Sequence, residues 1–167
     1  MSLLMCVSTE AADEIPARAV IERQFRQGPA AQAVQALQWA ERAVAAQPDD
    51  AAMRFLYGVM LSESRREADA IGVFERMVQD FPELPEPYNN LAVLHAGRGQ
   101  LDRSRELLEA ALRSDPNYRT AHQNLGDVFV RLALRAYEAA GRGNRADEPL
   151  QRRLRMTRDL VAAGAKP

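Results

Sequence analysis

Two histidines are the first residues in this sequence to consider for chemistry, because histidine supplies both general bases and metal ligands. Neither His95 nor His122 has a cysteine or a carboxylate motif at the spacing that metal ligation needs. No nucleophile beside a base and no paired carboxylates accompany them. Gly97-Arg98-Gly99 lacks the strand before it and the Lys-Ser/Thr after it that a phosphate loop requires, so it predicts a corner between two helices. We therefore expect no enzyme, no cofactor and no metal, with both histidines in core or turn positions.

Composition narrows the class of partner. The 167 residues carry 22 Lys and Arg against 23 Asp and Glu, so the chain lacks the positive field that phosphate binding needs, and we expect no nucleic acid. No stretch reaches the roughly 20 apolar residues of a membrane span, so no transmembrane segment is expected. Cys6 is the only cysteine, which excludes an internal disulfide. A protein or peptide partner remains.

A repeat in the sequence indicates which secondary-structure elements position these residues. Pro48, Pro82 and Pro116 lie 34 residues apart. A small, a bulky and a second small position recur at fixed offsets before the second and third prolines: Ala70, Phe74 and Met77, with Met77 at the late small position, then Ser104, Leu108 and Ala111. Antiparallel helices pack closely only where small side chains occupy their crossing, and a proline ends a helix. The spacing therefore predicts stacked helix pairs that bury one continuous apolar seam.

This period and these offsets resemble the tetratricopeptide repeat. The matching residues are Ala36, Ala43 and Pro48; Gly58, Ala70, Phe74 and Pro82; Tyr88, Leu91, Ala92, Ala111 and Pro116; and Leu125, Gly126 and Phe129. Arg54 and His122 depart from the pattern at a place that is usually aromatic. The resemblance implies an all-α, right-handed solenoid of antiparallel helix pairs that works as a protein-binding scaffold. The array is also similar to small proteobacterial proteins of this family, which favours a bacterial periplasm or cell envelope, with the cytoplasm as the alternative.

The same register predicts the domain organisation. We expect repeats at 17–50, 51–84 and 85–118, an irregular unit at 119–146, and a capping helix and tail at 147–167. The irregular unit is expected to be one long helix from about Thr120 to Ala140 that stops at Gly141. Residues 1–16 form an N-terminal tail, whose apolar Met1–Val7 is interpreted either as the remnant of an export signal or as a disordered end.

The capping helix is predicted from its own signals. Asp147-Glu148-Pro149 is typical of a helix start, and Leu150, Leu154, Thr157 and Val161 form an apolar stripe. Arg152, Arg153, Arg155 and Arg158 occupy the other side, as a solvated face or, alternatively, as a basic contact surface. Gly72, inside a predicted helix, is expected to mark a close helix crossing.

The resemblance also implies where a partner binds, because the family lines a concave groove with fixed positions of each first helix. The candidate peptide-binding residues are Phe55, Val59, Glu63, Asn89, Val93, Gln123, Asp127 and Arg131, with Phe55 and Asn89 as central contacts. Val59 and Val93 could instead pack against neighbouring helices. Clamping of a chaperone tail is disfavoured, since Phe55, Val59 and Thr120 stand where basic or amide groups would be needed. The alternative function is an assembly element that self-associates weakly or stacks in a larger cell-envelope complex.

Overall fold

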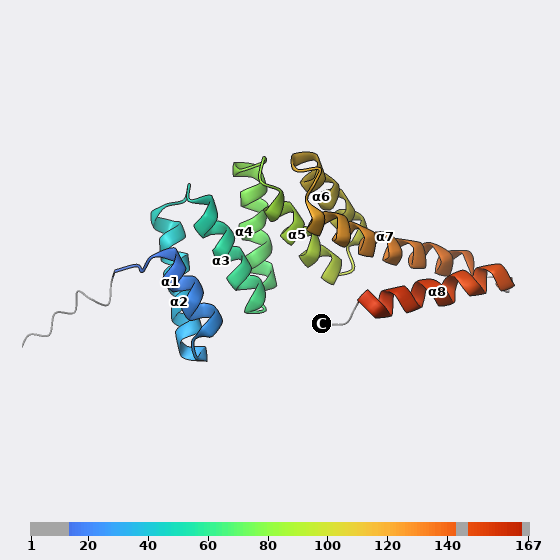
Figure 1. The fold of residues 1–167 in the computed structure, drawn as a ribbon, viewed down its shortest axis with the longest axis horizontal. Helices are drawn as coiled ribbons and strands as arrows, with labels where there is room; N and C mark the ends of the chain where they lie inside the picture. Colours follow the sequence, from blue (N-terminus) through green and yellow to red (C-terminus); the bar gives the residue numbers. More distant parts are fainter. Residues whose placement is uncertain (1–13, 143–146, 165–167) are drawn as a thin grey trace, which may run out of the picture. The chain divides into compact units, whose positions relative to one another are not determined.

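All regular secondary structure in the described part of the chain is helical, as predicted. The computed structural model describes residues 14–142 and 147–164, and within these ranges it contains eight helices and no strand (Figure 1). The expectations for Met1–Val7 and for the last three residues lie outside these ranges. The chain divides into two compact units, Met1–Val73 and Phe74–Pro167.

Unit 1 holds α1 (Arg18–Gln27), α2 (Ala30–Ala46), α3 (Ala51–Glu63) and the start of α4 (Glu67–Asp80), which continues into unit 2. Helix α2 packs against both α1 and α3. Ala36 and Ala40 are fully buried on α2, because small side chains let the helices approach closely. Asp50 is the N-cap of α3, and its Oδ1 accepts a hydrogen bond from the Met53 amide at 2.9 Å.

Unit 2 contains the remaining helices: α5 (Pro85–Gly97), α6 (Leu101–Ser114), α7 (Arg119–Ala140) and α8 (Glu148–Gly164). Its core is formed by fully buried side chains that include Phe74, Met77, Leu91 and Leu108. The corner between α5 and α6 falls at Gly97-Arg98-Gly99, as predicted. Gly99 adopts a φ of 75°, a left-handed conformation that glycine takes at little cost, and the Gln100 amide donates to the His95 carbonyl at 3.0 Å.

Arg54 and His122, which stand where the repeat usually has an aromatic residue, each contact the carbonyl group of the preceding proline. Arg54 Nη2 donates to the Pro48 carbonyl, and His122 Nε2 lies 2.9 Å from the Pro116 carbonyl. Each side chain reaches six residues back, so the repeat period places the same contact in both units. His95 Nδ1 lies 2.5 Å from Gln100 Oε1 at the α5–α6 corner. Both histidines therefore serve turns, which confirms that part of the expectation.

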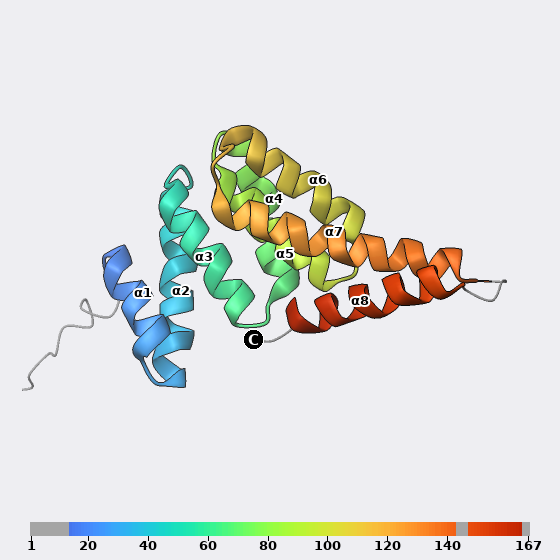
Figure 2. The ribbon, with the colours of Figure 1, turned by 45° about the vertical axis from the view of Figure 1, so that its right-hand side comes forward.

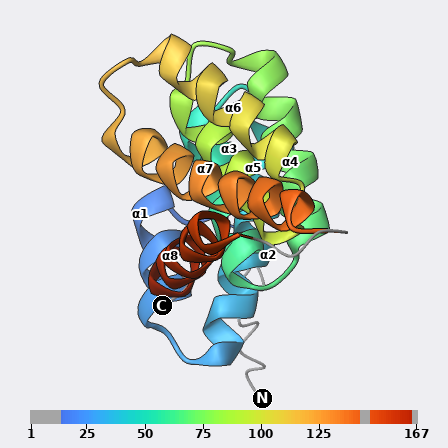
Figure 3. The same cartoon turned by 90° about the vertical axis from the view of Figure 1, so that its right-hand side faces the viewer.

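The long helix predicted for the irregular unit is confirmed, because α7 runs without a break from Arg119 to Ala140. It ends at Gly141, as predicted, and this glycine has a φ of −79° and a ψ of −8°, a right-handed conformation. Helix α8 returns antiparallel along α7 and lies on the side of α7 away from α6 (Figures 2 and 3). The predicted capping helix is thus present.

The packing of α8 follows its predicted stripe. Thr157 is buried, and Leu150, Leu154 and Val161 are half-buried. The four arginines on the other side are exposed. The helix begins as predicted, since Asp147 Oδ1 accepts from the Leu150 amide at 2.9 Å.

The expectation for Gly72 was wrong. A Cβ atom built on Gly72 would meet no heavy atom within 4 Å. The residue therefore occupies open space, and no close helix crossing explains the missing side chain.

Candidate functional site

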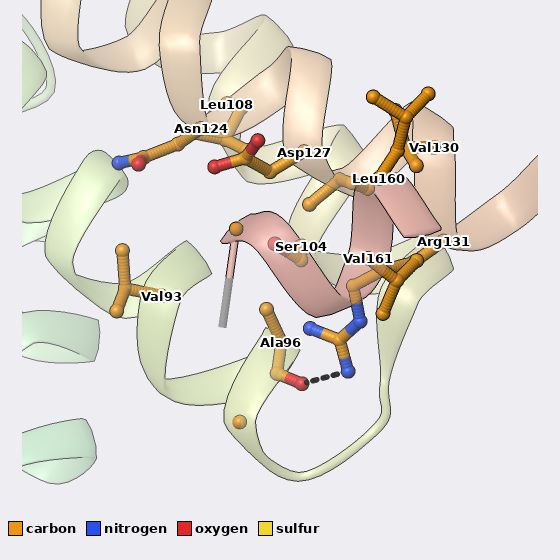
Figure 4. A pocket seen from close by; sticks show the side chains of 13 residues that line it. Val93, Ala96, Ser104, Leu108, Asn124, Asp127, Val130, Arg131, Leu160 and Val161 are labelled. Atoms are coloured by element: carbon orange, nitrogen blue, oxygen red, sulfur yellow. Dashed lines mark hydrogen bonds between the residues drawn. The ribbon is translucent and has the colours of Figure 1, made fainter. Parts of the chain in front are cut away.

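A cavity of about 470 Å³ lies inside unit 2, where α8 ends beside α5, α6 and α7 (Figure 4). Each of the four helices contributes to its walls. The walls are mainly aliphatic, and the side chains that form them include Val93, Leu108, Val128, Val130, Leu160 and Val161. Val93 and Leu160 are 50% and 58% exposed, so two aliphatic side chains of the cavity also face solvent. A cavity of this size with few polar groups is of the kind that binds ligands.

Four polar side chains complete the lining. Asn124 Nδ2 donates to Asn89 Oδ1 at 2.8 Å, which joins α7 to α5. Arg131 Nη2 donates to the Ala96 carbonyl at 2.9 Å, near the end of α5 (Figure 4). The same carbonyl also accepts a hydrogen bond from the Gly99 amide at 3.0 Å, so the Arg131 side chain adds a second donor at the α5–α6 corner.

The other two polar side chains have no partner among the described residues. Ser104 is fully buried, and its Oγ makes no hydrogen bond there. Asp127 is exposed on α7 and makes neither an ion pair nor a hydrogen bond with the described residues. Buried hydroxyl groups without partners are unusual in folded proteins, so Ser104 marks a point where the cavity is polar and unsatisfied.

The cavity brings together three of the residues that were predicted to bind a peptide. Val93, Asp127 and Arg131 all line it. Gln123 is exposed on α7 but does not contribute to the lining. Asn89 was expected to be a central contact, but its side chain is buried. It is 5% exposed, and its side-chain oxygen already accepts a hydrogen bond from Asn124.

The other three predicted residues lie on α3 in unit 1. Phe55 and Val59 are half-buried. Glu63 is exposed and forms an ion pair with Arg26 on α1, with 3.2 Å between Arg26 Nη1 and Glu63 Oε1. Glu63 therefore already has a partner within its own unit.

Sequence reasoning missed two contributions to the cavity. The first is Ser104, whose signal was a hydroxyl at the small-residue position that Ala70 occupies one repeat earlier. The second is the end of α8, with Leu160, Val161 and Gly164. The apolar stripe of α8 was recognised, but a stripe does not tell which face of α7 it will cover.

Other kinds of site find no support in the described ranges. Among residues 14–142 and 147–164 no group of three or more His, Cys, Asp or Glu side chains could hold a metal ion. Within the same ranges no helix has the length and apolar character needed to cross a membrane.

Solved structures show what this fold is similar to. The first tetratricopeptide domain of Spaghetti (RPAP3), bound to the HSP90 peptide SRMEEVD, matches with a TM-score of 0.62 and 16% identity, over 69% of this chain and 89% of that one. MamA from Desulfovibrio magneticus RS-1 matches with a TM-score of 0.54 and 19% identity, over 87% of this chain and 78% of that one. These similarities confirm the α-solenoid fold class.

Sequence comparison identifies the family. A curated relative, the TPR repeat-containing thioredoxin TTL4 of Arabidopsis thaliana, is 38% identical over 66 residues, which span 39% of this chain and only 10% of that protein. Two family models, each described as Tetratricopeptide repeat, match residues 21–85 and 61–126. Because these matches together run from residue 21 to residue 126, more than half of its length, the chain belongs to the tetratricopeptide repeat family.

Proposed function

We propose that this protein is a non-catalytic adaptor that binds a peptide or a helix of a partner protein at the cavity of unit 2. The proposal rests on one observation. Three residues that were chosen from the repeat register all line the same cavity: Val93, Asp127 and Arg131. Aliphatic walls would accept apolar side chains of the partner. The exposed amide of Gln123, on the same helix as Asp127, would hydrogen-bond to the partner's backbone.

The comparisons support binding over catalysis. The RPAP3 domain, which shares this fold, is described in complex with a peptide. The word thioredoxin in the name of the curated relative does not indicate a redox activity of this chain, since the match spans 10% of that protein. A chaperone tail is not proposed as the partner, because the aliphatic walls and Asp127 do not suit a strongly acidic peptide.

Three finer points belong to the same proposal. We divide the array into repeats at 17–50, 51–84 and 85–118, followed by an irregular unit at 119–146.

Phe55 and Val59 are proposed as a second contact in unit 1. Glu63 would contribute to it only after its ion pair with Arg26 breaks. A bacterial periplasm or cell envelope remains the proposed location.

Self-association is the second candidate function, and one observation favours it. Met156 and Leu160 are 61% and 58% exposed, and they lie one turn apart on α8. Exposed apolar side chains at this spacing would let two copies pack helix to helix. Light scattering over a range of protein concentrations tests this function, since a mass that stays that of the monomer at high concentration contradicts it.

The adaptor function is tested with random heptapeptides displayed on phage and selected on the full chain. Peptide binding, followed by fluorescence anisotropy, should weaken by about tenfold or more in Val93→Asp, because a carboxylate would replace an apolar wall of the cavity. Val34→Asp is the matched control, since Val34 is 60% exposed on α2 and lies outside the cavity. Failure to select any peptide, or equal binding by both variants, would show that the cavity is not the binding site.

A further inference from the structure

Asp127 does not form the ion pair with Arg131 that their spacing on α7 would allow. Arg131 follows it by four residues on α7, and an acidic residue four positions before a basic one is a favourable pair on a helix. In this structure the guanidinium group of Arg131 instead points toward the α5–α6 corner and donates to the Ala96 carbonyl (Figure 4). The Asp127 carboxylate is therefore left at the mouth of the cavity, available to a cation from outside.

A second negative feature lies at the same edge. Gly164 is the last residue of α8, and a Cβ atom built on it would lie 3.8 Å from Asp127 Oδ1. The carbonyl groups of a last helical turn have no partner within the helix and carry partial negative charge. The end of α8 and Asp127 thus present negative charge together, beside the aliphatic side chains of Val93 and Leu160.

Ser104 gives an independent indication that the cavity is built for a ligand. Its side chain is fully buried and lines the cavity, and its Oγ has no hydrogen-bond partner in the described structure. An unsatisfied buried hydroxyl costs free energy until a partner reaches it. A ligand group that enters the cavity and bonds to Ser104 would recover that cost.

We infer that the cavity selects a peptide in which a lysine or an arginine stands beside an apolar residue. The basic side chain would lay its aliphatic stem along Val93 and Leu160 and place its charged head on Asp127. The apolar neighbour would fill the interior between Leu108 and Val128. This inference rests on the proposed function and names the chemistry of the partner.

The test compares three pools of heptapeptides that are random except at the centre, which is lysine, norleucine or glutamate. Immobilised full chain should retain the lysine pool about fivefold more than the norleucine pool, as an ion pair of about 1 kcal/mol implies, and the excess should shrink in high salt. Asp127→Lys should reverse the order, so that the glutamate pool is retained best. Asp159→Lys is the matched control, because Asp159 is exposed on α8 and outside the cavity, and the natural order should persist in it.

A second variant separates binding from folding. Ser104→Ala removes a buried hydroxyl that has no partner among the described residues, so the variant should unfold at the same temperature as the natural chain or at a higher one, while retention of the lysine pool falls. Lys166 is the one lysine of the sequence, so the measurement is repeated with Lys166→Ala. A lysine preference in either chain supports the inference, and its absence from both overturns it. Equal retention of all pools contradicts only the inference, whereas no retention of any pool contradicts the adaptor function itself.

Discussion

Arg65 shows a local conflict between residue type and backbone conformation. It joins α3 to α4 with a φ of 60°, in the left-handed region that glycine adopts readily and other residues do not. The Arg66 amide donates to the Leu61 carbonyl at 2.9 Å, so the turn has the same hydrogen bond as the corner at Gly99. The later repeat thus places glycine at this point of the turn, and the earlier repeat places arginine there.

Replacing Arg65 with glycine should stabilise the protein. Arg65→Gly relieves the left-handed strain, and we expect the free energy of unfolding to rise by about 1 kcal/mol. Urea unfolding followed by circular dichroism measures the change. Arg98→Gly is the control, since Arg98 has a φ of −85° and a glycine there relieves nothing. A loss of stability in Arg65→Gly would mean that the side chain contributes more than the strain costs.

Tyr57 should make unit 1 sensitive to alkali. Burial raises the pKa of its phenol above 10.0, and the negative charge of Glu41 raises it further. The neutral phenol is therefore favoured in the folded state, and this contribution to stability is lost as the pH rises above about 10, where the unfolded phenol ionises first. The free energy of unfolding should fall between about pH 9 and pH 11, and fall less steeply in Tyr57→Phe. Equal slopes in both proteins would contradict this; the fall that remains in the variant is assigned to Tyr118, whose pKa is also raised, chiefly by burial.

At the scale of elements, the sequence predicted most of what local rules control. Three prolines at one spacing were enough for the helix pairs, because proline acts on its own turn and does not depend on distant contacts. The unbroken α7 was also predicted, and no proline interrupts the run from Thr120 to Ala140. The start of α8 followed from Asp147, whose side chain caps the helix it precedes.

What could not be predicted is where elements meet. The stripe of α8 fixed which of its faces is buried, but the choice between the two open sides of α7 depends on packing that no local pattern records. That choice decides the candidate site, because Leu160 and Val161 close the cavity beside Val93. Asn89 is a further example. The repeat register pointed to this position, but its side-chain oxygen accepts a hydrogen bond from Asn124, a residue 35 positions later in the chain, which no local pattern records.

At the scale of the whole molecule, the chain is a tandem array whose described part forms two compact units. Stability in such arrays is close to a sum of repeat terms and nearest-neighbour interfaces. A substitution in one core should therefore act mainly on its own unit. Ile21 on α1 and Leu91 on α5 are both fully buried aliphatic residues, so they form a matched pair for testing this expectation.

Ile21→Ala and Leu91→Ala should each lower local stability by about 2–5 kcal/mol, because each leaves a cavity in a packed core. Amide hydrogen exchange with mass spectrometry measures where that loss appears. Ile21→Ala should speed exchange most in α1, α2 and α3, and Leu91→Ala most in α5, α6 and α7, since helices open together with the neighbours they pack on. If either substitution speeds exchange equally along the described chain, the array unfolds as one body, and peptide binding at the cavity of unit 2 would then stabilise α1 as strongly as α7.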